Sequence, residues 1–261
     1  MSNVHSNAFN NVNTHTFTAG LLNIRSLTVY KSNYIIAAIY SKKYDFLALS
    51  EIWGEDKIKT VRALATPPGY SFFHSCRENK KEGGVGIICK NAFSPSVRKL
   101  NKFSTFEVVC VNLKSPALNI LTIYRTSICT NKFFDEFSEL ILYCDSLSTP
   151  YLFIGDFNIH FSKCNDVHAN SLKSVLELFS LKQHVNSPTH IFGNILDLII
   201  SDFKINSVNI EEPPRNISDH FLINFDFDIN IDTKIKHPKK QITFRDINSI
   251  DMDNFKTDIT N

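Results

Sequence analysis

The sequence is poor in glycine, methionine and tryptophan, and it lacks any long run of apolar residues. Its 261 residues include 8 Gly, 2 Met and 1 Trp but 22 Phe, a composition that indicates a dense aromatic core rather than a loop-rich scaffold. No stretch approaches the roughly 20 apolar residues of a membrane span. The polar N-terminus also lacks the apolar segment of a signal peptide. We therefore expect an intracellular protein without a membrane partner.

An excess of either charge is also absent. Lys and Arg total 28 while Asp and Glu total 26, which gives a net charge of +2. This balance excludes binding to nucleic acid by bulk attraction alone, although it leaves room for a local basic groove. Apolar residues make up 43% of the chain and charged residues 21%, so disorder along the whole length is excluded as well.

Several common functional motifs are missing. The six cysteines are scattered without a Cys-x-x-Cys pair, and most lie in apolar runs, as small buried residues do in a reducing compartment. A zinc site would need more tightly clustered ligands. The sequence contains neither a phosphate-binding loop of the Walker type nor the Gly-x-Ser-x-Gly turn of a serine hydrolase.

Short apolar runs and helical patterns alternate from about Leu21 to Asp228. The runs have the length and the Val, Ile and Phe content of strands; they are Leu21–Ile24, Phe46–Leu49, Val85–Cys89, Phe106–Leu113, Ile120–Tyr124, Tyr151–Ile154, Leu196–Ile200 and Phe221–Phe227. Helical spacing predicts helices at Asn33–Lys42, Phe133–Tyr143 and Ser171–Leu181. This mixture favours an α/β sandwich. Residues 1–20 are interpreted as a flexible leader, residues 21–228 as one domain, and residues 229–261 as a polar, linker-like tail.

Polar side chains that could carry chemistry stand at the ends of these strand-like runs. The strongest segment is Tyr151–Asn158, because a Gly allows close approach and the alternating Asp156 and Asn158 point the same way. Such a carboxylate can activate water. Asp197 is a lone acid in an apolar run, which is costly unless it is paired; His220 is the natural partner. Weaker candidates are Asn23, Glu51 as a ligand for a hard cation, and Tyr124 with Arg125 as phosphate contacts.

Taken in chain order, these segments resemble the endonuclease/exonuclease/phosphatase superfamily, and most of all the apurinic-type endonuclease domain of non-LTR (LINE-type) retrotransposons. The segments that carry the resemblance are Leu22–Leu27, Leu49–Trp53, Lys81–Gly86, Ile123–Arg125, Gly155–Asn158, Pro188–His190, Leu196–Ile199 and Ser218–His220. The resemblance covers about Leu21 to Asp228. It implies a four-layered, DNase I-like sandwich in which two mixed sheets pack face to face with helices outside.

The resemblance also implies roles for individual residues. Glu51, Asn23 and Asp219 would bind Mg²⁺ or Mn²⁺, a choice that suits their oxygen ligands. The implied catalytic residues are Asp156 as activator of water, Asn158 and Tyr124 at the phosphate, and Asp197 orienting His220; the choice of base between Asp156 and His220 stays open. Contacts with phosphate or DNA would come from Arg125, Thr189 and Ser218.

We therefore predict a metal-dependent endonuclease that nicks one strand of DNA. Two alternatives stay open: a phosphatase or phosphodiesterase acting on a small phosphorylated substrate, and a catalytically dead retroelement remnant. The sequence departs from related domains at His190, where an Arg is common. The sequence also ends with this tail. We therefore expect any associated reverse transcriptase to be encoded separately or lost. A monomer in the nucleus is the expected state.

Overall fold

Two six-stranded mixed sheets form the centre of the molecule. The computed structural model describes residues 13–53, 58–76, 82–126 and 128–231. The first sheet has the order β11-β12-β1-β2-β4-β3 and contains β1 (Thr14–Asn23), β2 (Phe46–Ser50), β3 (Tyr70–Ser75), β4 (Val85–Lys90), β11 (Ile205–Glu211) and β12 (Leu222–Asn230). The second has the order β5-β6-β7-β8-β10-β9 and contains β5 (Ser96–Arg98), β6 (Phe106–Lys114), β7 (Ala117–Arg125), β8 (Tyr151–Asp156), β9 (Lys182–Gln183) and β10 (Asp197–Ser201).

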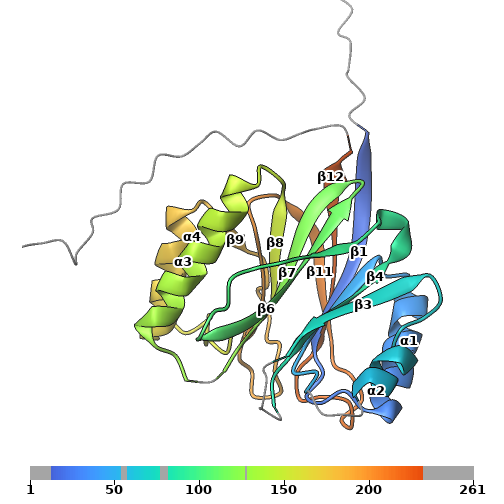
Figure 1. The fold of residues 1–261 in the computed structure, drawn as a ribbon. Helices are drawn as coiled ribbons and strands as arrows, with labels where there is room; N and C mark the ends of the chain where they lie inside the picture. Colours follow the sequence, from blue (N-terminus) through green and yellow to red (C-terminus); the bar gives the residue numbers. More distant parts are fainter. Residues whose placement is uncertain (1–12, 54–57, 77–81, 127, 232–261) are drawn as a thin grey trace, which may run out of the picture.

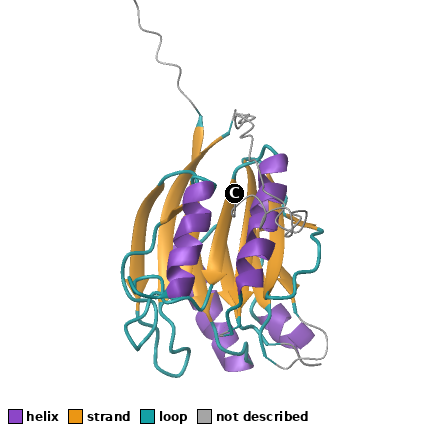
Figure 2. Cartoon of the chain, turned by 90° about the vertical axis from the view of Figure 1, so that its left-hand side faces the viewer, coloured by secondary structure: helices purple, strands orange, loops and turns teal. Residues whose placement is uncertain are grey.

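Helices cover the outer face of each sheet, as Figure 1 shows. The first sheet is covered by α1 (Val29–Lys42) and α2 (Ile58–Leu64), and the second by α3 (Asn131–Ser146) and α4 (Val167–Leu178). Figure 2 shows the helices lying along the strands. These four layers confirm the predicted α/β sandwich. None of the helices in the described ranges is long and apolar enough to cross a membrane.

The core between the sheets is aromatic, as the many Phe residues predict. Phe17 of β1 stacks on Phe227 of β12 with ring centroids 5.2 Å apart, and Phe46 of β2 packs within 6.2 Å of both. On the outer face of the second sheet, Phe137 of α3 lies 5.3 Å from Phe153 of β8. These ring contacts bury large apolar areas and fix the sheets and helices against each other.

Each sheet has one parallel pair at its centre, β1 with β2 and β7 with β8. The other neighbouring strands pair antiparallel. The carboxyl ends of these four central strands meet at one end of the sandwich, since Asn23 at the end of β1 contacts Asp156 at the end of β8. This end carries the predicted site residues.

The structure corrects the predicted limits of the domain. β1 begins at Thr14 and pairs with β12 from Thr14↔Asn230 onwards, so Thr14–Gly20 belongs to the fold rather than to a flexible leader. Phe17 and Ala19 are fully buried there, a short apolar alternation that the surrounding Thr residues hide in the sequence. The tail also begins later than predicted, because β12 runs to Asn230. The predicted leader at 1–12 and the tail from 232 onwards lie outside the described residues.

Candidate active site

Asn23 is the residue that links the two sheets at the site. Its side chain is fully buried, and its Nδ2 donates hydrogen bonds of 2.9 Å to both Glu51 Oε1 and Asp156 Oδ2. Its Oδ1 accepts from the backbone N of Arg25 at 3.0 Å, which fixes the orientation of the amide. One amide therefore holds a carboxylate from each sheet at a shared point.

Glu51 lies on the open side of this point. It follows β2 with a left-handed φ of 52°, a conformation supported by the hydrogen bond from Ser26 N to its carbonyl oxygen. Trp53 Nε1 donates to Glu51 Oε2 at 3.2 Å. Tyr124 at the end of β7 lies beside it: burial, reinforced by the charge of Glu51 and a hydrogen bond to it, raises the pKa of the Tyr124 phenol. The phenol is therefore a neutral donor at ordinary pH.

Asp156 is the most deeply placed carboxylate of the site. The residue before it must be Gly. Gly155 has a φ of 145°, and a Cβ at this position would stand 1.9 Å from the carbonyl oxygen of Ile123 on the neighbouring strand β7. Asn158 donates to Asp156 through its backbone N at 2.8 Å and through Nδ2 at 3.1 Å. Burial, and then the negative charge of Asp197, raise the pKa of Asp156. A carboxylate in such surroundings is a stronger base than one in water.

His220 and Asp197 form the predicted pair. His220 Nδ1 lies 2.8 Å from Asp197 Oδ2, and Asp197 stands directly opposite Asp156 in the β8–β10 register. Burial lowers the pKa of His220, but the charge and hydrogen bond of Asp197 outweigh this effect, and the net result is a pKa of about 9. The imidazole is therefore a cation at neutral pH, oriented through Nδ1 and leaving Nε2 for another partner.

The sequence matches a family of phosphoester hydrolases, in agreement with this cluster of carboxylates, amides and imidazole. Residues 20–220 match the model of the Endonuclease/Exonuclease/phosphatase family. The chain belongs to this family. No curated protein matches the sequence significantly. The family membership makes the protein an enzyme of the nuclease and phosphatase superfamily.

Solved structures of the family share the fold at low identity. The endonuclease domain of TRAS1, a telomere-specific non-LTR retrotransposon, is 15% identical with a TM-score of 0.62, over 84% of this chain and 100% of that one. The apurinic endonuclease LMAP from Leishmania major is 15% identical with a TM-score of 0.64, over 85% and 88%. The 3′ phosphatase NExo from Neisseria, bound to product DNA, is 15% identical with a TM-score of 0.63, over 80% and 98%.

Three residues predicted to contact phosphate or DNA instead hold the family's site together. Arg125 is 1% exposed, and its guanidinium turns inward to donate 2.5 Å hydrogen bonds to Phe157 O and Asn158 O while it lies over the Phe133 ring. In this structure the guanidinium is therefore turned away from the open side of the site, and its predicted contact with phosphate stays a prediction. The side chain positions the chain segment that carries Asn158.

Thr189 and Ser218 are also buried, and their hydroxyl groups bind backbone groups of the site. Thr189 is fully buried, and its Oγ1 accepts from Leu196 N at 3.0 Å and from Asp197 N at 3.1 Å. Ser218 Oγ donates to Asn23 O at 2.6 Å and accepts from His220 N at 3.0 Å. The first residue fixes Asp197 and the second fixes His220, so neither is placed as a direct contact to DNA.

The sequence interpretation gave His190 no role, yet this residue lies in the site. Its ring stands 4.7 Å from the ring of His220 in an edge-on contact, and its Nε2 lies 3.6 Å from Asp219 Oδ2. Arg25 forms an ion pair with the same Asp219 oxygen. The sequence could have indicated this role, because His190 directly follows Thr189 in the segment Pro188–His190, which carries the family resemblance.

The acidic residues present fit a hard divalent cation. Among the described residues, two sets of side chains lie close enough to share a cation: Asp156, Asp197 and His220, and beside them His190, Asp219 and His220. Glu51, the predicted ligand, lies in neither set but shares Asn23 with Asp156. Asp197 Oδ1 and Asp219 Oδ1 are buried without a hydrogen-bond partner, an unfavourable state that a cation or a substrate donor would relieve. Carboxylate and amide oxygens of this kind are the donors that Mg²⁺ and Mn²⁺ prefer.

Proposed function

We propose that this protein is a divalent-metal-dependent endonuclease that hydrolyses a phosphodiester in one strand of DNA. The observation that carries the proposal is the single cluster in which Asn23 joins Glu51 to Asp156, with the His220–Asp197 pair beside it. A base with a raised pKa, a charged imidazole and a partly exposed carboxylate are the groups that phosphodiester hydrolysis needs.

Asp156 is proposed as the group that takes the proton from the attacking water. Its carboxylate is held by hydrogen bonds from Asn23 and from Asn158, so its orientation is fixed before substrate arrives. Asn158 Nδ2 also donates to Arg125 O at 2.6 Å. This engagement supports a role for Asn158 in holding Asp156; its predicted contact with the phosphate would need an additional orientation of the amide.

His220 is proposed to stabilise the charge that develops on the phosphate. As a cation with a free Nε2, it can donate a charge-assisted hydrogen bond to a phosphoryl oxygen or to the leaving oxygen. Glu51, with Asp219 on the other side, would hold the metal ion. Asn23 presents its Nδ2 to the carboxylates and its Oδ1 accepts from Arg25 N, so its predicted ligation would need the amide to turn around. When bound, Mg²⁺ or Mn²⁺ would supply a Lewis acid that offsets the charge of the phosphoryl group.

DNA is proposed as the substrate on the strength of the structural relatives. Two are described as a retrotransposon endonuclease domain and an apurinic endonuclease. A third is described as a 3′ phosphatase bound to a DNA product, so even the phosphatase alternative has a DNA-bound example. A small phosphorylated substrate remains the rival proposal, and assays with DNA and with inositol phosphates distinguish the two.

The test is a nicking assay on supercoiled plasmid with Mg²⁺, with EDTA and with the His220→Ala variant. The proposal predicts conversion to open circles that requires the metal and is lost in the variant. Release of phosphate from an inositol phosphate, with the plasmid left intact by a folded protein, would replace the endonuclease by the phosphatase. Inactivity on plasmid, abasic DNA and small phosphates would identify a dead remnant.

A further inference from the structure

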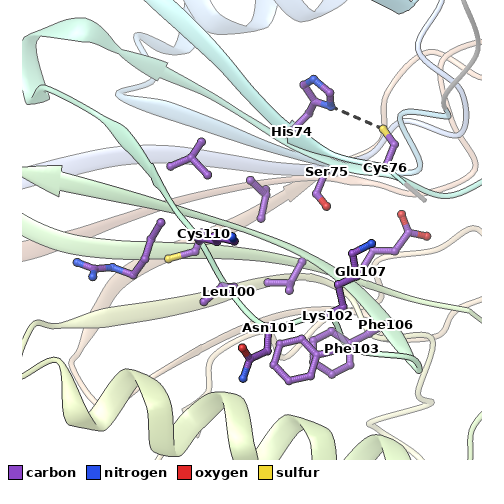
Figure 3. Close-up of a pocket in the computed structure, with 15 residues that line it drawn as sticks. His74, Ser75, Cys76, Leu100, Asn101, Lys102, Phe103, Phe106, Glu107 and Cys110 are labelled. Atoms are coloured by element: carbon purple, nitrogen blue, oxygen red, sulfur yellow. Dashed lines mark hydrogen bonds between the residues drawn. The ribbon is translucent and has the colours of Figure 1, made fainter. Parts of the chain in front are cut away.

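A cavity lies between the end of β3 and the segment that joins β5 to β6 (Figure 3). β5 pairs only with Cys110–Asn112 of β6, so the first half of β6 has no strand on that side within the described ranges. The chain after β5 bends away from this free edge and leaves a cleft of about 530 Å³. We call this cavity the edge cleft; its walls include His74, Cys76, Lys99, Lys102, Phe103 and Glu107.

The two walls of the edge cleft differ in chemistry. The end of β3 forms one wall with His74, Ser75 and Cys76, and the segment after β5 forms the other, as Figure 3 shows. On this second wall Lys99 and Lys102 are exposed, and Phe103, half-buried between them and the core, stacks on Phe106 with ring centroids 4.7 Å apart. Ammonium groups alternating with a fixed aromatic surface are what a nucleic-acid strand needs for its phosphates and bases.

The edge cleft also adjoins the active site through Glu107. This residue stands opposite Tyr124 in the β6–β7 register, and its carboxylate accepts from Gly84 N at 2.6 Å. Gly84 in turn accepts from Ile52 N at 3.3 Å, immediately after Glu51. Glu107 thus lines the edge cleft and is the register partner of Tyr124, so a nucleic-acid strand bound at Tyr124 would cross Glu107 to reach the cleft. Glu107 is itself buried and engaged with an amide, so its charge is directed into the wall.

We propose that the edge cleft binds the nucleic-acid strand that flanks the cleaved phosphodiester. Lys99 and Lys102 would contact its phosphates, and the surface of Leu100 and Phe103 would receive its bases. The inference rests on the proposed endonuclease function, because it is the reaction at Asp156 that brings this strand to the site. It adds a subsite outside the catalytic cluster and predicts that substrate length on one side of the cut affects affinity.

The test is the binding of a fluorescently labelled 12-nucleotide oligo-dT to the full chain without metal, followed by anisotropy over a range of salt concentrations. The Lys99→Ala/Lys102→Ala variant should bind about tenfold more weakly at low salt. The slope of the logarithm of the binding constant against the logarithm of the salt concentration should be shallower by about 1.4 in this variant. Each lost phosphate contact to a single strand contributes about 0.7 to the slope. The matched control is Lys182→Ala/Lys204→Ala, which removes two exposed lysines elsewhere and should change neither quantity.

The same variants are then compared on uncut duplexes whose flank is shortened on one side of the cleavage site. The wild-type protein and the control should lose affinity as this flank shortens, while the edge-cleft variant should be insensitive to its length, with kcat unchanged. Equal oligonucleotide binding by both double variants, or no binding by the wild type, overturns the inference. Binding that depends on Lys99 and Lys102 in a protein that cleaves no DNA would refute the endonuclease and the flanking-strand role, and would leave the edge cleft as a nucleic-acid-binding surface alone.

Discussion

The site has a buried half, formed by Asp156, Asp197 and His220, and an open half, formed by Glu51 and Asp219. The two halves differ in how far their charged side chains are exposed to solvent. In the buried half, Asp156, Asp197 and His220 are 0%, 1% and 6% exposed, and each is paired with another group of the cluster or with Asn23. In the open half, Glu51 is partly exposed and the Asp219 side chain is 21% exposed. Burying a charge is costly unless it is paired. We therefore propose that proton transfer belongs to the buried half and cation binding to the open half.

The largest effect should come from breaking the buried half at Asp156. The Asp156→Asn variant keeps the shape of the side chain but removes the proposed base, so kcat for nicking should fall by about 10³, within the usual range for general-base removal. KM should change little, because the side chain keeps its size, although its new NH2 group can no longer accept hydrogen bonds as a carboxylate oxygen does from Asn23 and Asn158. Steady-state kinetics on a labelled duplex measure both quantities, and a thermal melt checks that the variant is folded. A kcat within threefold of wild type would remove Asp156 from the mechanism.

A smaller effect of a different kind is expected from the open half. The Glu51→Gln variant weakens a proposed cation ligand, so the Mg²⁺ concentration that gives half-maximal nicking should rise about tenfold or more. A titration with Mg²⁺ measures this shift. The control is Glu177→Gln on the exposed face of α4, which should leave the titration unchanged. An unaltered metal requirement in Glu51→Gln would exclude Glu51 as a ligand.

The pairing within the buried half should be visible in the titration of His220. In the Asp197→Asn variant the hydrogen-bonded negative partner is lost while burial remains, so the pKa of His220 should fall from about 9 toward its ordinary value, with the charges of Asp156 and Asp219 still supporting the cation. NMR of the imidazole against pH measures the change. A His220 pKa that stays near 9 would mean that another group, rather than Asp197, supports the charge.

The same pair should make the metal-free fold sensitive to alkaline pH. Because the pKa of His220 is raised on folding, the pair contributes stability that is fully present below about 6.5 and is lost as pH rises through about 9. The loss should be on the order of 3 kcal/mol. Denaturant unfolding at pH 6 and pH 10 measures it, with Asp197→Asn as the comparison. Equal losses in both proteins would contradict the assignment.

The smallest effect is expected at Thr189, which supports the buried half from behind. The Thr189→Val variant keeps the volume but leaves the amides of Leu196 and Asp197 without their acceptor, a change worth about 1–3 kcal/mol of unfolding free energy. Denaturant unfolding measures the loss. Thr66→Val serves as the control, because the Thr66 hydroxyl donates to a single carbonyl at the end of α2. Full stability in Thr189→Val would mean that these amides find other partners.

The strands and helices with mainly apolar residues could be predicted from the sequence. Each predicted strand run and helix overlaps an element of the structure, because buried central strands consist of consecutive Val, Ile, Leu and Phe residues. β3 and β11 were missed because they lie at sheet edges with mixed or exposed side chains, and β5 and β9 because they are only three and two residues long. Edge strands of this kind carry little periodic signal.

The direction of side chains could not be predicted in the same way. Arg125 and Tyr124 are neighbours at the end of β7, yet Tyr124 faces Glu51 while Arg125 turns to Phe157 and Asn158. Thr189 and Ser218 lie in segments that carry the family resemblance, but their hydroxyls bind backbone groups inside the molecule. The sequence identified residues that the structure brings together, whereas the packing of the two sheets decides which of their side chains turn inward.

The most direct test of the account compares the two halves in one experiment. Nicking by Asp156→Asn and Glu51→Gln is measured while Mg²⁺ is raised from limiting to saturating concentrations. The account predicts that excess metal restores most of the activity of Glu51→Gln and almost none of the activity of Asp156→Asn. Rescue of both variants, or of Asp156→Asn alone, would contradict the division of the site into a proton-transferring half and a cation-binding half.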